Sequence, residues 1–335
     1  MQKYIELLRK PMQVKPESLR AARQKSSSTP PHVYRLNYNE SPYGLGPLSE
    51  EALEKAIKTP YVYPDWFSVE LKTNIAKLYD LDFENVVVGP GSSAMINMLG
   101  ELFINPGDEF IFGDPSYEAF RDVANDYGAV TVPVPLDDDM NYDLDAMLAA
   151  VTDKTKILVV VNPNNPTGTF IDSKKLEDFI RKVPKHVITV IDEAYLEFVT
   201  DENCYSMLKL IKEGIDKPLV IMKTFSKIYG MAGLRVGYAI TDPVMADHFG
   251  KSSNAWNVSF IGQKTAAAAT LDQEHVSMVK NINAQERDKV TKVLRSLNCK
   301  VYDSQTKPLV DYYTKAGCIA NIDGATGLEN VFADI

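Results

Sequence analysis

Seven short runs of β-branched and other apolar residues constrain what this chain can fold into. The runs are Val86–Val88, Phe110–Phe112, Ala129–Val132, Ile157–Val161, Val187–Ile191, Leu219–Met222 and Val236–Ile240. Amphipathic segments with helical periodicity, such as Ala94–Phe103 and Ser173–Arg181, separate most of them. Strands this apolar, without alternation of polar and apolar residues, are those covered by helices on both faces. We therefore predict an α/β fold in which a mostly parallel, seven-stranded, doubly wound sheet is sandwiched by helices.

The character of the sequence changes after Asp242. A run of alanines at Ala266–Ala269 and a long charged, periodic stretch at Gln273–Leu297 predict helices, and a short strand is expected near Cys299–Tyr302. The tract S-S-S-T-P-P at Ser26–Pro31 predicts a loop after a short N-terminal helix. We expect a large domain at residues 45–245, a smaller α+β domain at 246–335, and an N-terminal segment at 1–44 that packs on the smaller domain.

Composition excludes several classes of function. The chain has 335 residues, of which 45% are hydrophobic and 24% charged, and its net charge is −9. This acidic balance argues against a nucleic-acid partner, because phosphate backbones are bound by clustered Lys and Arg. No window reaches the roughly 18 apolar residues that a membrane span needs. The three cysteines form no C-x-x-C pair, which favours reduced thiols and a cytoplasmic protein, and the four histidines lack metal-ligand spacing.

Two motifs with turn-forming residues follow predicted strands. The first is G-P-G-S-S at Gly89–Ser93, where small residues let backbone N–H groups and a helix N-terminus approach an anion. Taken alone, this motif is better explained as a plain turn, since it lacks the lysine of a P-loop and the third glycine of a dinucleotide fingerprint. The second is N-P-N-N-P-T-G at Asn162–Gly168, whose asparagines can donate to a ligand oxygen without bringing charge.

Two further strand ends carry ionisable side chains. Asp192, in D-E-A-Y, follows a buried strand, and a carboxylate there needs a cationic or N–H partner to offset its desolvation. Lys227 lies in T-F-S-K-I-Y-G-M-A-G-L-R, where apolar neighbours and nearby cations lower the pKa of an amine and make it a nucleophile. Arg235, eight residues later, can clamp a phosphate with its planar fork.

Ligands collect at the carboxyl ends of strands in open α/β sheets, so the four motifs should share one site. An anion cradle, an uncharged donor, a buried carboxylate and an activated amine meet the needs of pyridoxal phosphate. The sequence therefore predicts a site for this cofactor.

The order of the motifs resembles that of the fold-type I pyridoxal-phosphate aminotransferases of class I/II, and most closely the histidinol-phosphate aminotransferase group. The matching pieces are G-x-G-S, P-x-Y, N-P-N-N-P-T-G, D-E-A-Y, T-x-S-K and A-G-L-R-x-G-Y, together with L-N-Y-N-E-S-P at Leu36–Pro42 and Y-P-D at Tyr63–Asp65. The resemblance implies an amino-group exchange between an amino donor and a 2-oxo acid or imidazole-acetol phosphate, by a ping-pong Schiff-base mechanism. Histidine biosynthesis is the implied context.

The resemblance also implies a role for each site residue. Lys227 would carry the cofactor as a Schiff base and shuttle a proton, and Asp192 would keep the pyridine nitrogen protonated. Asn165 and Tyr195 would bond the phenolic oxygen, and Tyr117 would stack on the ring. The phosphate would be held by Ser92, Ser93, Thr224, Ser226 and Arg235.

The resemblance further implies a homodimer with shared active sites, in which residues 1–44 also touch the partner subunit. Tyr63 would reach the phosphate of the second subunit. The C-terminal region departs from the pattern, because G-C-I-A-N at Gly317–Asn321 and G-L-E-N-V at Gly327–Val331 lack the arginines with which the group grips its substrate. Either pieces of the chain are missing, or other residues hold the anionic end of the substrate, such as Lys307, Arg20, Arg23 or Arg35.

Three alternatives remain open at this point. The same scaffold supports decarboxylases, racemases and lyases, because the cofactor stabilises the carbanion for each reaction. A non-catalytic cofactor-binding module of a regulator is a second alternative, although the residues before Leu36 are too few and not basic enough for a DNA-binding domain. A nucleotide-binding enzyme would use Gly89–Ser93 as its phosphate loop but would leave Lys227 and Asp192 unexplained.

Overall fold

A computed structural model describes residues 38–297 and residue 301. Within these residues, seven strands form one sheet in the order β1-β7-β6-β5-β4-β2-β3. The strands are β1 (Val86–Gly89), β2 (Glu109–Asp114), β3 (Val130–Pro135), β4 (Thr155–Val161), β5 (Ile188–Asp192), β6 (Leu219–Thr224) and β7 (Gly237–Ile240). Each contains or overlaps one of the seven predicted runs, so the predicted strand content is confirmed.

Most of the sheet is parallel, as predicted. β2 pairs in parallel with β3 and β4, and the parallel arrangement continues through β5 to β6. β7 is the exception, because it lies antiparallel to both β6 and β1. The connection from β6 to β7 contains only the 3-10 turn η5 (Ala232–Leu234), and a connection without a crossover helix returns the chain antiparallel to the strand it left.

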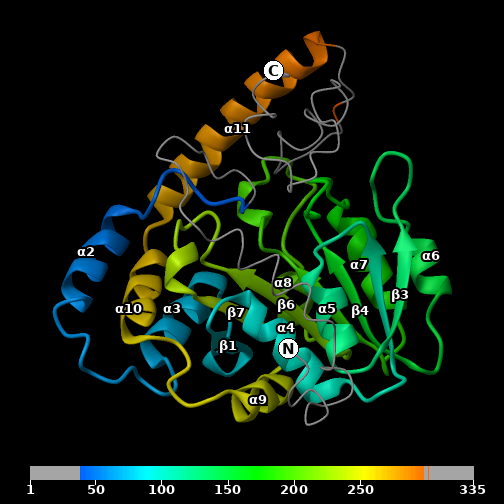
Figure 1. Ribbon diagram of the computed structural model, residues 1–335, viewed down its shortest axis with the longest axis horizontal. Coiled ribbons are helices and arrows are strands. Elements are labelled where there is room, and N and C mark those ends of the chain that lie inside the picture. The colour runs from blue at the N-terminus through cyan, green and yellow to red at the C-terminus, as the bar shows by residue number, and fades with distance from the viewer. Residues whose placement is uncertain (1–37, 298–300, 302–335) are drawn as a thin grey trace, which may run out of the picture.

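Helices cover both faces of the sheet (Figure 1). The described helices are α2 (Pro47–Ala56), α3 (Val69–Tyr79), α4 (Ser92–Phe103), α5 (Ala119–Asp126), α6 (Leu144–Ala149), α7 (Ser173–Lys182), α8 (Leu208–Lys212), α9 (Pro243–Ser252), α10 (Phe260–Ala269) and α11 (Gln273–Ser296), with 3-10 turns η3 (Phe83–Asn85) and η4 (Leu196–Phe198). Among them, α4 and α7 contain the segments predicted from periodicity, and α11 ends one residue before the predicted limit at Leu297.

Alternate residues of the strands face two separate cores. Val159 and Val161 of β4 pack with α4, α5 and α9, whereas Leu158 and Val160 pack with α3, α7, α10 and α11. All four of these side chains are at most 2% exposed. A strand buried on both faces has no polar side to show, which is why the central strands read as continuous apolar runs. The edge strand β3 is less covered, and Val130 is 52% exposed.

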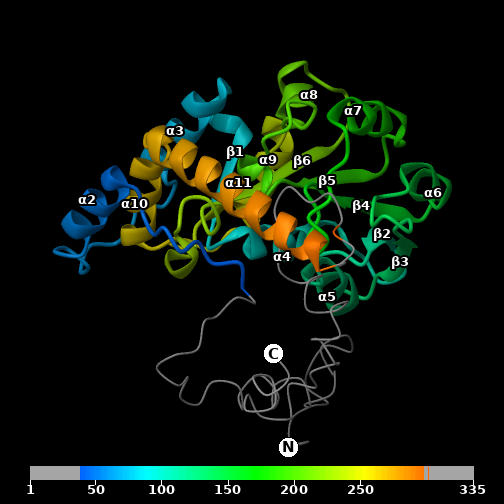
Figure 2. The same cartoon turned by 90° about the horizontal axis from the view of Figure 1, so that it is seen from above.

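The N-terminal side of the described chain lies against helices that come late in the sequence. α2 packs beside α10, as both Figure 1 and Figure 2 show, and the Leu48 N–H donates to Asp272 just before α11 at 3.0 Å. α9 spans the predicted boundary at residues 245/246 and packs Ala246 and Phe249 on the sheet face that α4 covers. The division into a larger and a smaller domain stays a prediction.

Several expectations fall outside the described residues. They are the N-terminal helix, the loop at Ser26–Pro31, most of the strand near Cys299–Tyr302, and the C-terminal segments without arginine. Among the described helices, none combines the length and the apolar composition needed to cross a membrane.

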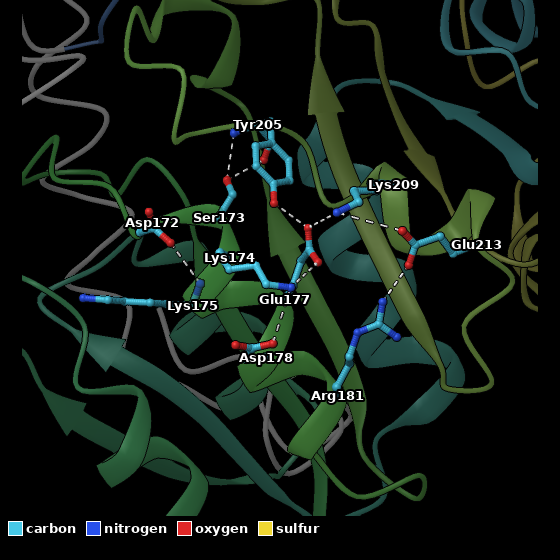
Figure 3. Close-up of polar contacts among 10 residues, drawn as sticks. All are labelled: Asp172, Ser173, Lys174, Lys175, Glu177, Asp178, Arg181, Tyr205, Lys209 and Glu213. Atoms are coloured by element: carbon cyan, nitrogen blue, oxygen red, sulfur yellow. Dashed lines mark hydrogen bonds and ion pairs between the residues drawn. The ribbon is translucent and has the colours of Figure 1, made fainter.

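A buried carboxylate joins α7 to the segment that leads into α8 (Figure 3). The Glu177 side chain is 2% exposed and accepts hydrogen bonds from the Tyr205 hydroxyl at 2.5 Å and from Lys209 Nζ at 2.7 Å. Lys174, on the same helix, adds an ion pair at 3.7 Å. Burial alone would raise the Glu177 pKa, but the bonds from Lys209 and Tyr205 bring the pKa below its ordinary value. The charged form of Glu177 therefore holds two helices of this face together.

Replacing Glu177 by glutamine should lower the free energy of unfolding by about 1–3 kcal/mol, because the neutral amide weakens the bonds from Tyr205 and Lys209 and leaves Lys209 without its buried counter-ion. Urea unfolding of the cofactor-free protein measures this change. The matched control is Asp178→Asn, since Asp178 lies next along α7 with its side chain 57% exposed, and its one ion pair among the described residues is a 3.9 Å contact to Lys174. An equal loss in both variants would contradict the interpretation.

Candidate active site

The carboxyl ends of β1, β4, β5 and β6 meet at one edge of the sheet. Val161 and Asp192, the last residues of β4 and β5, are paired. β7 enters at the same edge, where Gly237 lies between Gly89 at the end of β1 and Thr224 at the end of β6. The four motifs found in the sequence therefore follow strands that end side by side, which is where open α/β sheets bind their ligands.

Hydrogen-bond donors gather at the start of α4. Ser92 and Ser93 form the first turn of this 12-residue helix, whose first N–H groups have no intrahelical acceptor. Gly91 precedes them with a φ of +82°, and a Cβ there would lie 2.3 Å from Arg235 Nη2. Arg235 Nη1 donates to Ser226 Oγ at 3.3 Å. A helix N-terminus, a guanidinium and a hydroxyl group thus surround one position, which suits an anion.

Close backbone approaches fix the shape of this cradle. A Cβ on Gly237 would lie 2.3 Å from the Ser92 nitrogen, so β7 passes directly beside the start of α4. Arg235 has a φ of 54°, in the left-handed region that side chains rarely adopt. Thr224 Oγ1 accepts from the Ser226 N–H at 3.0 Å and shapes the turn that leads to Lys227. Strain of this kind persists only where the surrounding structure enforces it.

Asp192 is a buried carboxylate at the floor of the site. It is 3% exposed, and its Oδ1 accepts from the Ala194 N–H at 3.0 Å. Burial raises its pKa to about 6, with a further contribution from Glu193, while the Ala194 N–H and the ammonium groups of Lys223 and Lys227 oppose that rise. A cationic N–H placed against this carboxylate would replace the solvation that it lacks.

Lys227 and Tyr195 both contact the start of the described chain, at Tyr38 and Asn39. Lys227 Nζ donates to the main-chain oxygens of Tyr38 at 2.9 Å and Asn39 at 3.4 Å, and it lies 5.5 Å from the centre of the Tyr195 ring. Asn39 Nδ2 donates to the Tyr195 hydroxyl at 2.9 Å. Burial raises the pKa of Tyr195 to about 12, although the Asn39 bond opposes the rise. Tyr195 therefore stays a neutral donor at any ordinary pH.

Tyr117 completes the wall of the site. It is 36% exposed and lies close enough to Asp192 and Arg235 for their charges to act on its hydroxyl, which also shares a hydrogen bond with Ser93. Burial, the largest influence, raises the Tyr117 pKa. The structure thus brings Tyr117 together with the carboxylate floor and the anion cradle.

The two adjacent asparagines of N-P-N-N-P-T-G have different surroundings. Asn164 is 1% exposed and is consumed by structural bonds: its Oδ1 accepts from Ser116 at 2.8 Å and from Tyr142 at 3.1 Å, and its Nδ2 donates to Thr167 at 3.0 Å. Asn165 is half-buried in the turn after β4. The side chain of Asn165 takes part in none of these bonds, so Asn165 is the better candidate of the two for binding a ligand.

Tyr63 is not brought into the site of its own chain. It is 76% exposed and packs against Trp256, with ring centres 4.9 Å apart. The Trp66 ring is tilted by 59° against that of Trp256, with ring centres 5.0 Å apart, and the neighbouring Phe67 is 69% exposed. These four aromatic side chains, which we call the aromatic patch, lie on the surface.

Sequence reasoning missed a buried ion cluster behind the site. Lys223 Nζ lies 3.1 Å from Glu193 Oε2 and 2.8 Å from Glu197 Oε1, and the Lys223 and Glu193 side chains are 3% and 2% exposed. Lys223 precedes Thr224 and Glu193 follows Asp192 in the chain. Because side chains alternate along a strand, Lys223 and Glu193 point to the face of the sheet opposite to that of these two site residues. The sequence did contain a lysine before T-F-S-K and two glutamates in D-E-A-Y-L-E, from which this ion cluster could have been predicted. Asn39 was also missed, although its motif was recognised.

The fold and this constellation define the class of protein. The chain belongs to the family described as aminotransferase class I and II, whose sequence profile matches residues 31–310.

Individual relatives agree with this assignment. The chain is 36% identical over 268 residues to a histidinol-phosphate aminotransferase of Moorella thermoacetica, which covers 80% of this chain and 69% of that protein. It is 37% identical over 295 residues to an aromatic amino acid aminotransferase of Mycobacteroides abscessus, covering 88% and 84% of the two chains. Among solved structures, histidinol-phosphate aminotransferase of Sinorhizobium meliloti in complex with pyridoxal-5'-phosphate superposes with a TM-score of 0.79 at 28% identity, covering 91% of this chain and 80% of that one.

The raised pKa of Asp192 predicts how stability depends on pH. In the unfolded chain this carboxyl ionises near 3.8, whereas in the folded protein its pKa is about 6. Folding therefore favours the protonated group, and the stability it contributes below about pH 4 is lost as the pH rises through about 6. Asp192→Asn stays neutral, so at pH 7 the cofactor-free variant should be more stable than the wild type, by up to about 3 kcal/mol.

Urea unfolding of the cofactor-free protein between pH 4 and pH 8 measures this difference. The advantage of Asp192→Asn should shrink towards zero at the acid end, while the surface control Asp178→Asn should follow the wild type at every pH. A variant that is less stable than the wild type at pH 7 would show that the charged form of Asp192 is the favoured one.

Proposed function

We propose that this protein is a pyridoxal-phosphate-dependent aminotransferase that exchanges an amino group between an amino donor and a 2-oxo acid. The observation that carries the proposal is the convergence of Lys227, Asp192 and Arg235 at one sheet edge, with an amine, a buried carboxylate and an anion cradle in reach of one small molecule. Family membership agrees with it. Decarboxylase, racemase, lyase, regulatory and nucleotide-binding alternatives draw no support from the relatives.

The residues present fit this cofactor. Its phosphate would lie at the start of α4 against Ser92, Ser93, Thr224, Ser226 and Arg235. When bound, pyridoxal phosphate supplies an electron sink for the electron pair left on the substrate carbon. Asp192 would hold a proton at the ring nitrogen, because its own carboxylate is buried and gains from a cationic partner.

The remaining side chains would position the group and move protons. Tyr117 would pack on the ring face, and Asn165 and Tyr195 would donate to the phenolic oxygen. Lys227 would carry the group covalently and then move a proton at the substrate α-carbon through its Nζ. Asn165, Tyr117 and Tyr195 bring no charge of their own at neutral pH, so the charge balance of the site depends on Lys227, Asp192 and Arg235.

For the substrate, we propose histidinol phosphate and its oxo counterpart imidazole-acetol phosphate, with an amino acid such as glutamate as the second pair. The names of several relatives that are 36–37% identical support this choice. An aromatic amino acid is the second candidate, favoured by a relative that shares more of its length with this chain. The residues proposed from sequence for the anionic end of the substrate, Lys307, Arg20, Arg23 and Arg35, lie outside the described part of the chain.

We also propose a homodimer in which Tyr63 reaches the phosphate of the partner subunit's cofactor. The aromatic patch supports this, because four large aromatic side chains exposed together are typical of a surface that meets another protein. A cytoplasmic location and reduced thiols belong to the same proposal, and the described Cys204 is free and buried.

Borohydride reduction tests the cofactor assignment. Reduction of the yellow holoenzyme should fix the cofactor on Lys227, so peptide mapping should find the label there, and Lys227→Ala should neither take the label nor convert substrate. The control is Lys264→Ala, since Lys264 lies on α10 in a surface ion pair with Glu70. A label on another residue, or none, would overturn the assignment.

A donor panel tests the substrate. Histidinol phosphate should convert the wild-type holoenzyme to its amino form at least about tenfold more efficiently, in kcat/KM, than phenylalanine or tyrosine, a difference of roughly 1.4 kcal/mol in transition-state binding. Histidinol without its phosphate is the matched control for the anionic group. A preference for the aromatic amino acids would select the second candidate.

A subunit-mixing experiment tests the shared site. Tyr63→Ala and Lys227→Ala homodimers should each have little activity, but mixed dimers would contain one site with Lys227 from one chain and Tyr63 from the other. Random mixing should recover about a quarter of the wild-type activity, because half of the dimers are mixed and half of their sites are intact. No recovery, with subunit exchange verified by mass, would mean that Tyr63 does not act across the interface.

A further inference from the structure

Asn39 connects residues 38–44, the described part of the N-terminal segment, to both reactive side chains of the site. Its side-chain Nδ2 donates to the Tyr195 hydroxyl at 2.9 Å, and its main-chain oxygen accepts from Lys227 Nζ at 3.4 Å. Residues 38–44 lie against the Lys227 turn, because the Gly44 carbonyl approaches Gly230 so closely that a Cβ there would lie only 1.9 Å from it. The close approach of these two backbone segments therefore fixes the position of Asn39 relative to Lys227.

The direction of the hydrogen bond decides what Tyr195 can do. A phenol carries one proton and accepts through its oxygen, and the Asn39 amide occupies the accepting side. The Tyr195 proton is then left for a different acceptor. A donor placed on the phenol oxygen also makes the phenol a stronger donor in turn, since hydrogen bonds in a chain polarise one another.

Asparagine suits the backbone at this position as well. Asn39 has a φ of 51°, in the left-handed region that glycine, asparagine and aspartate tolerate best. Glycine would keep this backbone without the amide, and aspartate would keep both backbone and shape but could only accept when ionised. Comparing asparagine, glycine and aspartate at this position therefore distinguishes the effect of the backbone conformation from the effect of the side-chain N–H donor.

We propose that Asn39 is a positioning residue for the amino-group exchange, which donates to the Tyr195 hydroxyl so that the phenol proton is directed at the phenolic oxygen of the bound cofactor. This inference rests on the proposed function, because it takes Tyr195 to face that oxygen. Asn39 acts through Tyr195 and needs no contact with substrate. Its effect on Lys227 runs through main-chain oxygens, which substitutions of the side chain leave in place.

The pH dependence of the holoenzyme's visible absorption reports on this donor. A hydrogen bond from Tyr195 to the negatively charged phenolic oxygen disfavours protonation of the cofactor, so a weaker donor raises the midpoint pH. The other titratable groups that act on Tyr195 are Asp192, Tyr117 and Lys227, and Asn39→Gly alters none of them. Asn39→Gly should therefore raise the midpoint by about half to one pH unit and lower kcat about three- to tenfold.

The same change in a Tyr195→Phe background separates positioning from structure. Without the phenol, Asn39→Gly should shift neither the midpoint nor kcat any further, because the group on which Asn39 acts is absent. Asn39→Asp should lower kcat more than Asn39→Gly does, about ten- to a hundredfold. An ionised carboxylate at this position accepts a hydrogen bond from the Tyr195 hydroxyl, which then no longer donates to the cofactor. The control is Ser41→Ala in the same segment, whose Oγ accepts only a long 3.4 Å bond from the Tyr43 N–H among the contacts of the described residues.

Each outcome is decisive for one of the two proposals. Wild-type protein that gains no visible absorption on adding pyridoxal phosphate would refute the proposed function. Wild-type protein that gains it, with Asn39→Gly matching Ser41→Ala, or with equal losses in the presence and absence of the Tyr195 hydroxyl, would refute the role of Asn39 alone. Circular dichroism and urea unfolding of the cofactor-free variants confirm that each one folds.

Discussion

The carboxylate of Asp192 is held out of water at the end of β5, and the rest of the site is arranged around that fact. A buried carboxylate that lacks a counter-charge takes up a proton, which is why burial raises the Asp192 pKa to about 6. Lys227 and Lys223 limit the rise, but Lys223 is already paired with Glu193 and Glu197 on the other face of the sheet. The buried carboxylate therefore favours a cationic ligand beside it, and the protonated ring nitrogen of the proposed cofactor would supply that charge.

Much of the fold could be predicted from the sequence because the signals were local. The apolar runs of β4 and β5 are too apolar for surface strands, and their last residues, Val161 and Asp192, are paired at the edge that the motifs follow. Strand direction was less accessible. β7 is as apolar as its neighbours, and its reversal depends on the absence of a crossover helix after Lys227, which apolarity alone does not encode.

What the sequence could not supply were contacts between distant residues. Asn39 and Tyr195 are 156 positions apart, and no periodicity or spacing links them. In the sequence Lys223 looks like an ordinary charged residue, and only the fold places it between two carboxylates. The difference between Asn164 and Asn165 likewise depends on the fold, because Ser116 and Tyr142 donate to the side-chain oxygen of Asn164. Tyr63 shows the remaining limit, since its proposed role involves a second chain.

Residues 38–44, the described part of the N-terminal segment, are attached to the site by hydrogen bonds that depend on the state of Lys227. As an ammonium, Lys227 Nζ donates to the main-chain oxygens of Tyr38 and Asn39. A covalent attachment at Nζ removes protons from this group, so the segment would lose donors there while the bond from Asn39 to Tyr195 would be unaffected. The close approach of Gly44 to Gly230 still holds the segment in place. Loading the site would therefore remove bonds from Lys227 and leave residues 38–44 attached through the bond from Asn39 to Tyr195 and the contact between Gly44 and Gly230.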